Sequence, residues 1–179
     1  MEALTDDNLS VLACEARHID LLVDIANKAY SDNYLHIWDD EGVLYLEKNF
    51  SKPVLASELA DKNNCFFLVQ NREKFVGFAK IVLCKSFGDY TADESLYVQR
   101  LYLRKAYCGL GIGAKLMMQF HQKALALHKK VVWLQAMPST PSVSFYEKLG
   151  YTITHKGYIP FPHIKPAYRD LYDMVYKLE

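Results

Sequence analysis

The stretch that most constrains this chain is "RKAYCGLGIGAKLMM", residues 104–118, because three glycines stand at alternate positions directly before an apolar, helix-like run. Backbone N–H groups at the start of a helix have no acceptor within the helix, and together with the helix dipole they attract anions. Gly109, Gly111 and Gly113 would let a diphosphate approach that backbone. The pattern predicts a strand, an anion-binding turn and a helix. The same glycines would also suit a plain strand-to-helix turn that only needs positive φ.

The rest of the chain predicts a single domain, residues 1–179, with a mixed α/β or α+β sheet. Its residues are 51% apolar, enough for one sizeable core, and neither a repeat nor a Gly/Ser-rich linker divides it. A helix-rich front half precedes a β-hairpin and then a β-α-β-α-β order. The expected strands are 9–16, 65–70, 74–85, 95–105, 131–136 and one near 171–178; the expected helices are 18–34, one or two within 41–61, about 111–130 and 141–149.

One irregularity marks the expected strand "SLYVQRLYLRK". Leu96 and Val98 alternate as a strand requires, but the next apolar pair, Leu101 and Leu103, has the opposite parity. A one-residue slip sends side chains to the other face of a sheet, so the pattern predicts a β-bulge at Gln99–Arg100. Bulges often neighbour active sites. The alternative is a central strand that is covered on both faces.

Two familiar phosphate motifs fit the glycine stretch poorly. Residues 109–114 satisfy the dinucleotide pattern G-x-G-x-x-G/A, but the next expected strand ends in Gln135 rather than the acidic residue that would bind a ribose hydroxyl. The Walker pattern fails because Ala114 stands in place of its second glycine and Leu116 in place of its Ser or Thr. A dinucleotide oxidoreductase therefore becomes a distant alternative, and a kinase or NTPase is disfavoured.

Two further segments complete the pattern. "FYEKLGY", residues 145–151, follows an apolar strand, and "DLYDMVYKLE" ends the chain. With the glycine stretch, these segments resemble the GCN5-related N-acetyltransferase (GNAT) family, whose loop is Gln/Arg-x-x-Gly-x-Gly/Ala and whose second motif contains Phe-Tyr-x-Lys-x-Gly. The resemblance covers residues 94–179 and implies a mixed, mostly antiparallel sheet with helices on both faces. Within the family, the chain looks most like bacterial PaiA-type polyamine N-acetyltransferases.

The resemblance implies transfer of acetyl from acetyl-coenzyme A to a primary amine of a small molecule, without a covalent enzyme intermediate. An acceptor amine on a protein or peptide, or a catalytically weak coenzyme sensor or partner-binding module, are the alternatives. In the family, a strand backbone pairs with the pantetheine arm and loop amides hold the pyrophosphate. The positions that correspond here are Leu101, Tyr102, Leu103, Cys108, Gly109, Leu110, Gly111, Ile112, Gly113, Ala114, Ser139 and Lys148.

Tyr146 is the expected catalytic residue by the same resemblance, although a lone tyrosine there could also be a packing residue. It would act near the coenzyme sulfur as a general acid or hydrogen-bond donor. Ordinary pKa values of roughly 10 for Tyr and about 8.5 for a thiol make full proton transfer to the thiolate uphill by about 2 kcal/mol. A hydrogen bond to the forming thiolate is therefore the expected role.

The chain departs from the family at three positions. Gln99 stands on the bulged strand where polyamine acetyltransferases often have a glutamate, Cys108 replaces Gln or Arg, and Ser139 replaces an Asn. The acceptor amine, with a pKa near 10 like that of Lys, must lose a proton through a base or a water chain. The candidates to bind the amine are Asp32, Asp39, Glu94 and Gln99, with Asp40 beside them; for each of the three aspartates taken alone, a solvated charge at a helix end is the favoured interpretation.

Charge and composition limit the kinds of partner that the chain is expected to have. Lys plus Arg and Asp plus Glu number 21 each, so no overall basic field would attract nucleic acid or a membrane. Lys156, Lys165 and Arg169 would disfavour a highly cationic acceptor if they point into the cleft. Four dispersed cysteines, no evident signal peptide in "MEALTDDNLSV" and no long apolar run predict a reduced, cytoplasmic protein. The six histidines form no ligand motif, so no metal is expected, and a homodimer is plausible.

Overall fold

One twisted sheet organises residues 9–178, the part of the chain that the computed structural model describes. The residues before Leu9, on which the expectation of no signal peptide mainly depends, lie outside this part. The sheet has the strand order β1-β2-β3-β4-β5-β7-β6, and all neighbours are antiparallel except β4 and β5. The strands are β1 (Leu9–Ala13), β2 (Asn64–Asn71), β3 (Lys74–Val82), β4 (Ser95–Leu103), β5 (Val131–Ala136), β6 (Thr152–Tyr158) and β7 (Asp170–Lys177).

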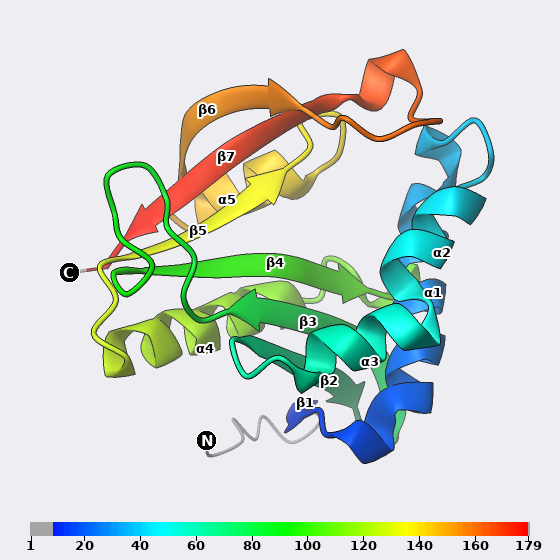
Figure 1. Cartoon of the computed structure of the whole chain (residues 1–179), viewed down its shortest axis with the longest axis horizontal. Helices are drawn as coiled ribbons and strands as arrows, with labels where there is room; N and C mark the ends of the chain where they lie inside the picture. Colours follow the sequence, from blue (N-terminus) through cyan, green and yellow to red (C-terminus); the bar gives the residue numbers. More distant parts are fainter. Residues whose placement is uncertain (1–8, 179) are drawn as a thin grey trace.

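Helices cover both faces of this sheet (Figure 1). The cluster beneath α4 and α5 includes Leu116 and Phe120, packed on apolar residues of the central strands. The cluster beneath the other three helices includes Leu22, Phe50 and Phe78. The helices are α1 (Ile19–Tyr34), α2 (Val43–Phe50), α3 (Lys52–Ala60), α4 (Ile112–Ala126) and α5 (Ser142–Lys148). The expected fold class, a mixed and mostly antiparallel sheet with helices on both faces, is confirmed.

The expected bulge in β4 is confirmed. Lys80 pairs with Arg100 and the next residue, Ile81, pairs with Val98, so Gln99 is the extra residue on β4. The bulge turns Arg100 and Tyr102 toward the α1–α3 face, while Leu101 packs with the α4 face.

Beyond the bulge, β4 and β5 separate. Their parallel pairing runs only from Ser95 with Val131 to Val98 with Leu134. The two strands start side by side and diverge toward α1 (Figure 1). The sheet therefore opens where its two central strands lose each other's hydrogen bonds, and this opening positions the site described below.

Two expectations about elements need correction. Strand β6 was not expected; it is an edge strand whose segment "TITHKGY" is mostly polar, so it lacks clear apolar alternation. Helix α4 was expected to reach about Lys130 but ends at Ala126, because His128 adopts a left-handed backbone with φ 55° and the chain turns into β5. Both errors lie where tertiary contacts, rather than local pattern, decide the backbone.

Candidate active site

A cavity of about 770 Å³ occupies the opening between β4 and β5. Its walls come from both halves of the chain: α1 and α2 on one side, and the glycine loop, the start of α4 and α5 on the other. The bulged part of β4 and the end of β5 lie between these two walls. The cavity therefore has one side built from the front helices and one built around the glycines.

The glycine loop has the backbone that an anion-binding turn requires. Gly109 and Gly111 have φ values of 76° and 80°, and a Cβ built on either would point into open space. The first backbone bond into α4 runs from the Lys115 N–H to the Gly111 carbonyl at 3.1 Å. The amides that precede it in the first turn have no acceptor within the helix, so they are available to an anion.

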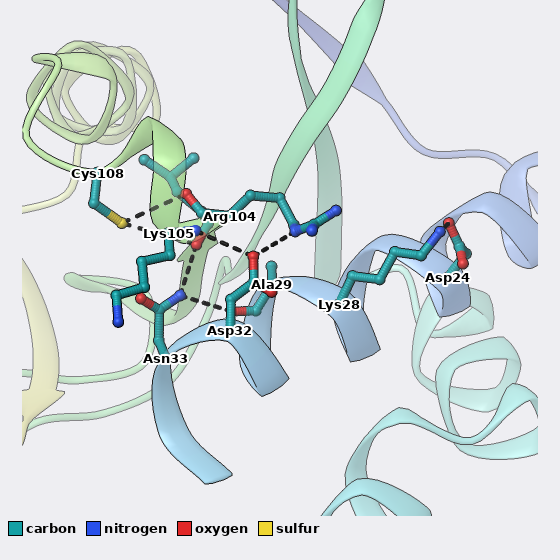
Figure 2. A network of polar contacts seen from close by, with 9 residues as sticks. Asp24, Lys28, Ala29, Asp32, Asn33, Arg104, Lys105 and Cys108 are labelled. Atoms are coloured by element: carbon teal, nitrogen blue, oxygen red, sulfur yellow. Dashed lines mark hydrogen bonds and ion pairs between the residues drawn. The ribbon is translucent and has the colours of Figure 1, made fainter. Parts of the chain in front are cut away.

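Helix α1 anchors the segment that leads into this loop (Figure 2). One Asp32 carboxylate oxygen accepts hydrogen bonds from the Arg104 Nε, at 2.5 Å, and from the Lys105 backbone amide, at 3.2 Å. The Asn33 amide donates to the Leu103 carbonyl at 2.9 Å. The hydrogen bond from Arg104 is the main reason that the pKa of Asp32 lies below its ordinary value. Asp32 thus supports the loop, and it does not line the cavity.

Cys108 stands at the entrance of the loop, where the family has Gln or Arg. Its thiol lies 3.9 Å from the Leu103 carbonyl and 3.7 Å from the Arg104 carbonyl. Burial raises the pKa of this thiol, so it stays protonated at neutral pH. Cys108 therefore adds no charge to the loop, and the glycines that follow it have the left-handed φ values given above.

Tyr146 lies on α5 and faces the cavity from the side of the glycine loop. Its side chain is 9% exposed, and its ring packs against Phe145 and Tyr151. Desolvation raises the pKa of this phenol well above its ordinary value, so the hydroxyl is neutral and can donate a hydrogen bond. Within residues 9–178 no hydrogen bond to this hydroxyl is formed, which leaves it free to act on a ligand.

Gln99 and Tyr97 occupy the bulged edge of the cavity. The side-chain oxygen of Gln99 is buried and accepts no hydrogen bond from the described residues, which is costly unless a ligand supplies a donor. The Tyr97 hydroxyl lies 3.1 Å from the Gln135 oxygen, and the Gln135 amide donates to Asp173 at 2.8 Å. Burial raises the pKa of Tyr97, so this phenol is neutral as well.

The front side of the cavity is aromatic. Trp38, Tyr45, Tyr30 and Tyr34 form a continuous stack with ring centroids 4.8, 4.8 and 5.0 Å apart. Tyr102 of β4 packs edge-on against Tyr30 and Tyr34. Burial raises the pKa of all four tyrosines, that of Tyr34 to about 12, so the wall carries no phenolate at neutral pH.

A buried charge cluster lies behind this wall. Glu58 of α3 binds Arg100 through both carboxylate oxygens, one at 2.5 Å and one at 3.1 Å, and binds Lys80 at 3.1 Å. The side chains of Lys80 and Arg100 are 4% and 7% exposed. Two cations thus share one carboxylate beside the cavity.

The structure brings most of the expected site residues together, but not all of them. Glu94 lies before β4, where it pairs with Lys130, and Asp39 is exposed; neither lines the cavity. Asp40 caps α2 by accepting from the Gly42 and Leu44 amides. The expected residues that line the cavity are Gln99, Leu101, Tyr102, Leu103, Cys108, Gly109, Gly111, Gly113, Ala114 and Tyr146, while Leu110, Ile112, Ser139 and Lys148 belong to adjoining segments without lining it.

Sequence reasoning missed the aromatic wall and two hydroxyls. Thr140 and Ser142 line the cavity beside the exposed Ser139, and their hydroxyls lie 2.6 Å apart. Nothing in the spacing distinguished these hydroxyls from Ser139. The tyrosines were missed because a ring on an amphipathic helix is ordinarily core. The cationic residues of the 155–170 segment, whose direction was open, do not line the cavity.

Residues 9–178 contain neither a membrane-spanning helix nor a cluster of metal ligands. No helix there is both long and apolar enough to cross a membrane. No group of three or more His, Cys, Asp or Glu side chains there is arranged to hold a metal ion.

A sheet opened between two parallel strands, with a glycine loop at a helix start beside the opening, defines a fold that acyl-coenzyme A transferases use. The acetyltransferase (GNAT) family matches residues 20–151. The chain belongs to this family, as the glycine loop and the "FYEKLGY" segment predicted, and the expected enzyme class, a transferase, is the class of the family.

Among curated proteins, an uncharacterized N-acetyltransferase from the pepI 3' region of Lactobacillus delbrueckii subsp. lactis is 25% identical over 109 residues. The match covers 60% of this chain and spans 63% of that relative's length.

Solved structures agree in fold. PaiA N-acetyltransferase from Thermoplasma acidophilum, in complex with coenzyme A, matches with a TM-score of 0.74 and 16% identity over 94% of this chain and 98% of that one. A chimera of the spermidine N-acetyltransferase SpeG, from Vibrio cholerae and hSSAT, matches with a TM-score of 0.70 and 15% identity over 96% of both chains. At this identity the likeness concerns the fold.

Proposed function

We propose that the chain is an acetyl-coenzyme A-dependent N-acetyltransferase that acts on the primary amine of a small molecule, by direct attack in a ternary complex. The observation that carries the proposal is one continuous cavity in which the open amides of the glycine loop, the free Tyr146 hydroxyl and the parted strands β4 and β5 meet. These are the parts needed to hold a diphosphate, seat a thioester and stabilise its sulfur.

The residues present fit the coenzyme. The loop amides would hold the pyrophosphate, since both open glycines leave their outer side unobstructed. The backbone of residues 101–103, which has no partner strand on the β5 side, would pair with the amides of the pantetheine arm. The coenzyme supplies the activated acetyl group as a thioester.

The roles of this chain's residues follow from their protonation. Tyr146, kept neutral by burial, would donate a hydrogen bond to the leaving sulfur, which stabilises developing negative charge. Gln99 would accept a hydrogen bond from the attacking amine through its unpaired oxygen. Among the described residues that line the cavity there is no carboxylate or imidazole, so the amine would lose its proton to water before or during attack.

The test is thiol release from acetyl-coenzyme A with polyamines, amino acids, aminoglycosides, arylalkylamines and peptide N-termini as acceptors, together with calorimetric binding of coenzyme A. We expect coenzyme binding and turnover with at least one small amine. Failure to bind coenzyme A would refute the proposal, and turnover restricted to peptide amines would move the acceptor to a protein.

A second candidate is a coenzyme-binding sensor without turnover. The absence of a carboxylate or imidazole from the described cavity wall favours it, because the acceptor then has no direct side-chain base. Tight coenzyme binding without turnover across the whole panel, at pH 9 as well as at pH 7, would identify this function.

A further inference from the structure

The charges on and beside the front side of the cavity limit which acceptor amines can bind there. The inference drawn from these charges rests on the proposed function. Among the described lining residues none is an aspartate or a glutamate, and the one charged at neutral pH is Arg100. Two carboxylates near the cavity are paired with cations, Glu58 with Arg100 and Lys80, and Asp32 with Arg104. Asp173 accepts a hydrogen bond from the neutral Gln135 amide, and it does not line the cavity. An acceptor with several ammonium groups would therefore enter a cavity whose described wall contains no carboxylate and which lies beside two buried cations that share one carboxylate.

The aromatic wall does not replace the missing carboxylates. A ring attracts cations over its face and repels them at its edge, because its quadrupole is negative on the face and positive on the rim. Tyr30 stacks against both Tyr34 and Tyr45, and Tyr45 stacks against both Tyr30 and Trp38. The faces of Tyr30 and Tyr45 are therefore covered by neighbouring rings, and these two rings can present only their edges to a ligand. Such edges suit the face of another aromatic ring.

One buried polar atom of β4 belongs to the same cavity as this wall. The Gln99 oxygen is buried, unpaired and placed at the bulge, where the strands part and the thioester would lie. As a neutral acceptor it can take a hydrogen bond from an N–H of one amine, but it cannot balance a second charge. We propose that the acceptor is a primary monoamine with an aromatic body, which lies along the tyrosine wall and donates a hydrogen bond to Gln99, and that polyamines are excluded by charge.

Matched acceptors test this proposal on the wild-type protein. Butylamine and 1,4-diaminobutane differ only in the second ammonium group, and 2-phenylethylamine adds a ring to a short monoamine. We expect kcat/KM to fall at least tenfold from butylamine to 1,4-diaminobutane and to rise at least tenfold from butylamine to 2-phenylethylamine. Equal or better use of 1,4-diaminobutane or spermidine would overturn the proposal while leaving the proposed function intact.

A binding measurement separates the two hypotheses when turnover is absent. Calorimetry on the coenzyme A complex should detect 2-phenylethylamine at concentrations where spermidine gives no signal. If this holds without any acetyl transfer, the cavity is selective as inferred and the proposed function fails. Tighter binding of spermidine would overturn the inference whether or not the protein turns over.

The isosteric variant Gln99→Glu tests the role of Gln99 itself. A carboxylate at this position should raise the ratio of kcat/KM for 1,4-diaminobutane over butylamine about tenfold or more, because it supplies the missing anion. Gln70→Glu is the control: the Gln70 side chain lies on the β2–β3 hairpin, donates to the Arg72 carbonyl and does not line the cavity. This variant adds the same charge away from the cavity and should leave the ratio unchanged. If Gln99→Glu binds coenzyme A normally and its ratio stays at the wild-type value, the amine does not lie at Gln99.

Discussion

The two sides of the cavity are built on different physical principles. The glycine-loop side presents backbone amides, and two glycines with left-handed φ set the conformation of that backbone. The front side presents side chains, and its character depends on the identity of each ring and on one buried charge cluster. The binding surface of the glycine-loop side can be predicted from the spacing of its glycines. The binding surface of the front side depends on each side chain, so a single substitution can change it.

The largest effect that separates the two sides should come from Gly111→Val. A β-branched residue is strained at φ 80°, so the loop must move, and several amide N–H groups no longer point toward the pyrophosphate. Loss of two charge-assisted hydrogen bonds, together about 4 kcal/mol, would weaken coenzyme A binding about a thousandfold, which calorimetry can measure.

Gly88→Val is the matched control for this variant. Gly88 also has positive φ, at 55°, and open space around its missing Cβ, but it lies in the β3–β4 connection and does not line the cavity. Its substitution should alter stability and leave coenzyme affinity unchanged. A similar loss of affinity in both variants would mean that the effect of Gly111→Val is a general loss of folding.

On the front side, the largest effect should come from Glu58→Gln. This change leaves Arg100 and Lys80 without their shared anion in a buried place, and breaking such a pair costs about 3 kcal/mol in the free energy of unfolding. Denaturant unfolding would measure it, with Asp24→Asn, which breaks the exposed pair with Lys28, as a control expected to cost less than about 1 kcal/mol. Since Arg100 lines the front side of the cavity, KM for the amine should rise while the affinity for coenzyme A stays unchanged. If amine binding and coenzyme A binding weakened by the same factor, the two sides of the cavity would not be independent.

Tyr146→Phe should separate chemistry from binding on the glycine-loop side. The ring and its packing on Tyr151 remain, but the donor to the leaving sulfur is lost, so kcat should fall about a hundredfold with coenzyme affinity nearly unchanged. Tyr151→Phe is the control, because its hydroxyl bonds His121 at 2.8 Å and only stability should suffer. The reverse pattern, lost affinity with normal kcat, would contradict the role given to Tyr146.

The pH dependence of kcat/KM for the amine should show that the acceptor side has no general base. With no carboxylate or imidazole on the described wall, the reactive species is the neutral amine, whose fraction rises about tenfold per pH unit below a pKa near 10. We expect kcat/KM to rise with that slope from pH 7 to pH 9. Tyr146 should impose no decline in this range, because burial raises its pKa above the ordinary value. A plateau reached near pH 7 would reveal a base.

The same contrast explains what the sequence could and could not predict. The order of most elements, the glycine turn and the bulge at Gln99 follow from local patterns, because each depends on a few neighbouring residues and their alternation. Edge strand β6 was not predicted because it pairs with β7 alone among the described strands and is mostly exposed, so its sequence lacks an alternation of apolar and polar residues. The carboxylates of Asp32 and Glu94 were assigned to the acceptor because charge is visible in a sequence. Their partners, Arg104 and Lys130, lie 72 and 36 positions away, and pairing over such separations leaves no local sign.

The smallest effect is expected from Glu94→Gln, which tests whether Glu94 lies outside the acceptor site. Its carboxylate binds the Lys130 ammonium and the Thr91 amide, and these hydrogen bonds lower its pKa to about 2. Because the folded pKa lies below the unfolded value, the carboxylate stabilises the fold fully above pH 4.5, and that stabilisation is lost as pH falls toward 2. Glu94→Gln should therefore lower the unfolding midpoint slightly at pH 7 and make it less sensitive to acid between pH 4.5 and pH 2, measured by thermal unfolding. Turnover at pH 8 should match that of the wild-type chain, since Glu94 lies outside the cavity; a large loss of kcat/KM for the amine alone would return this carboxylate to the acceptor site.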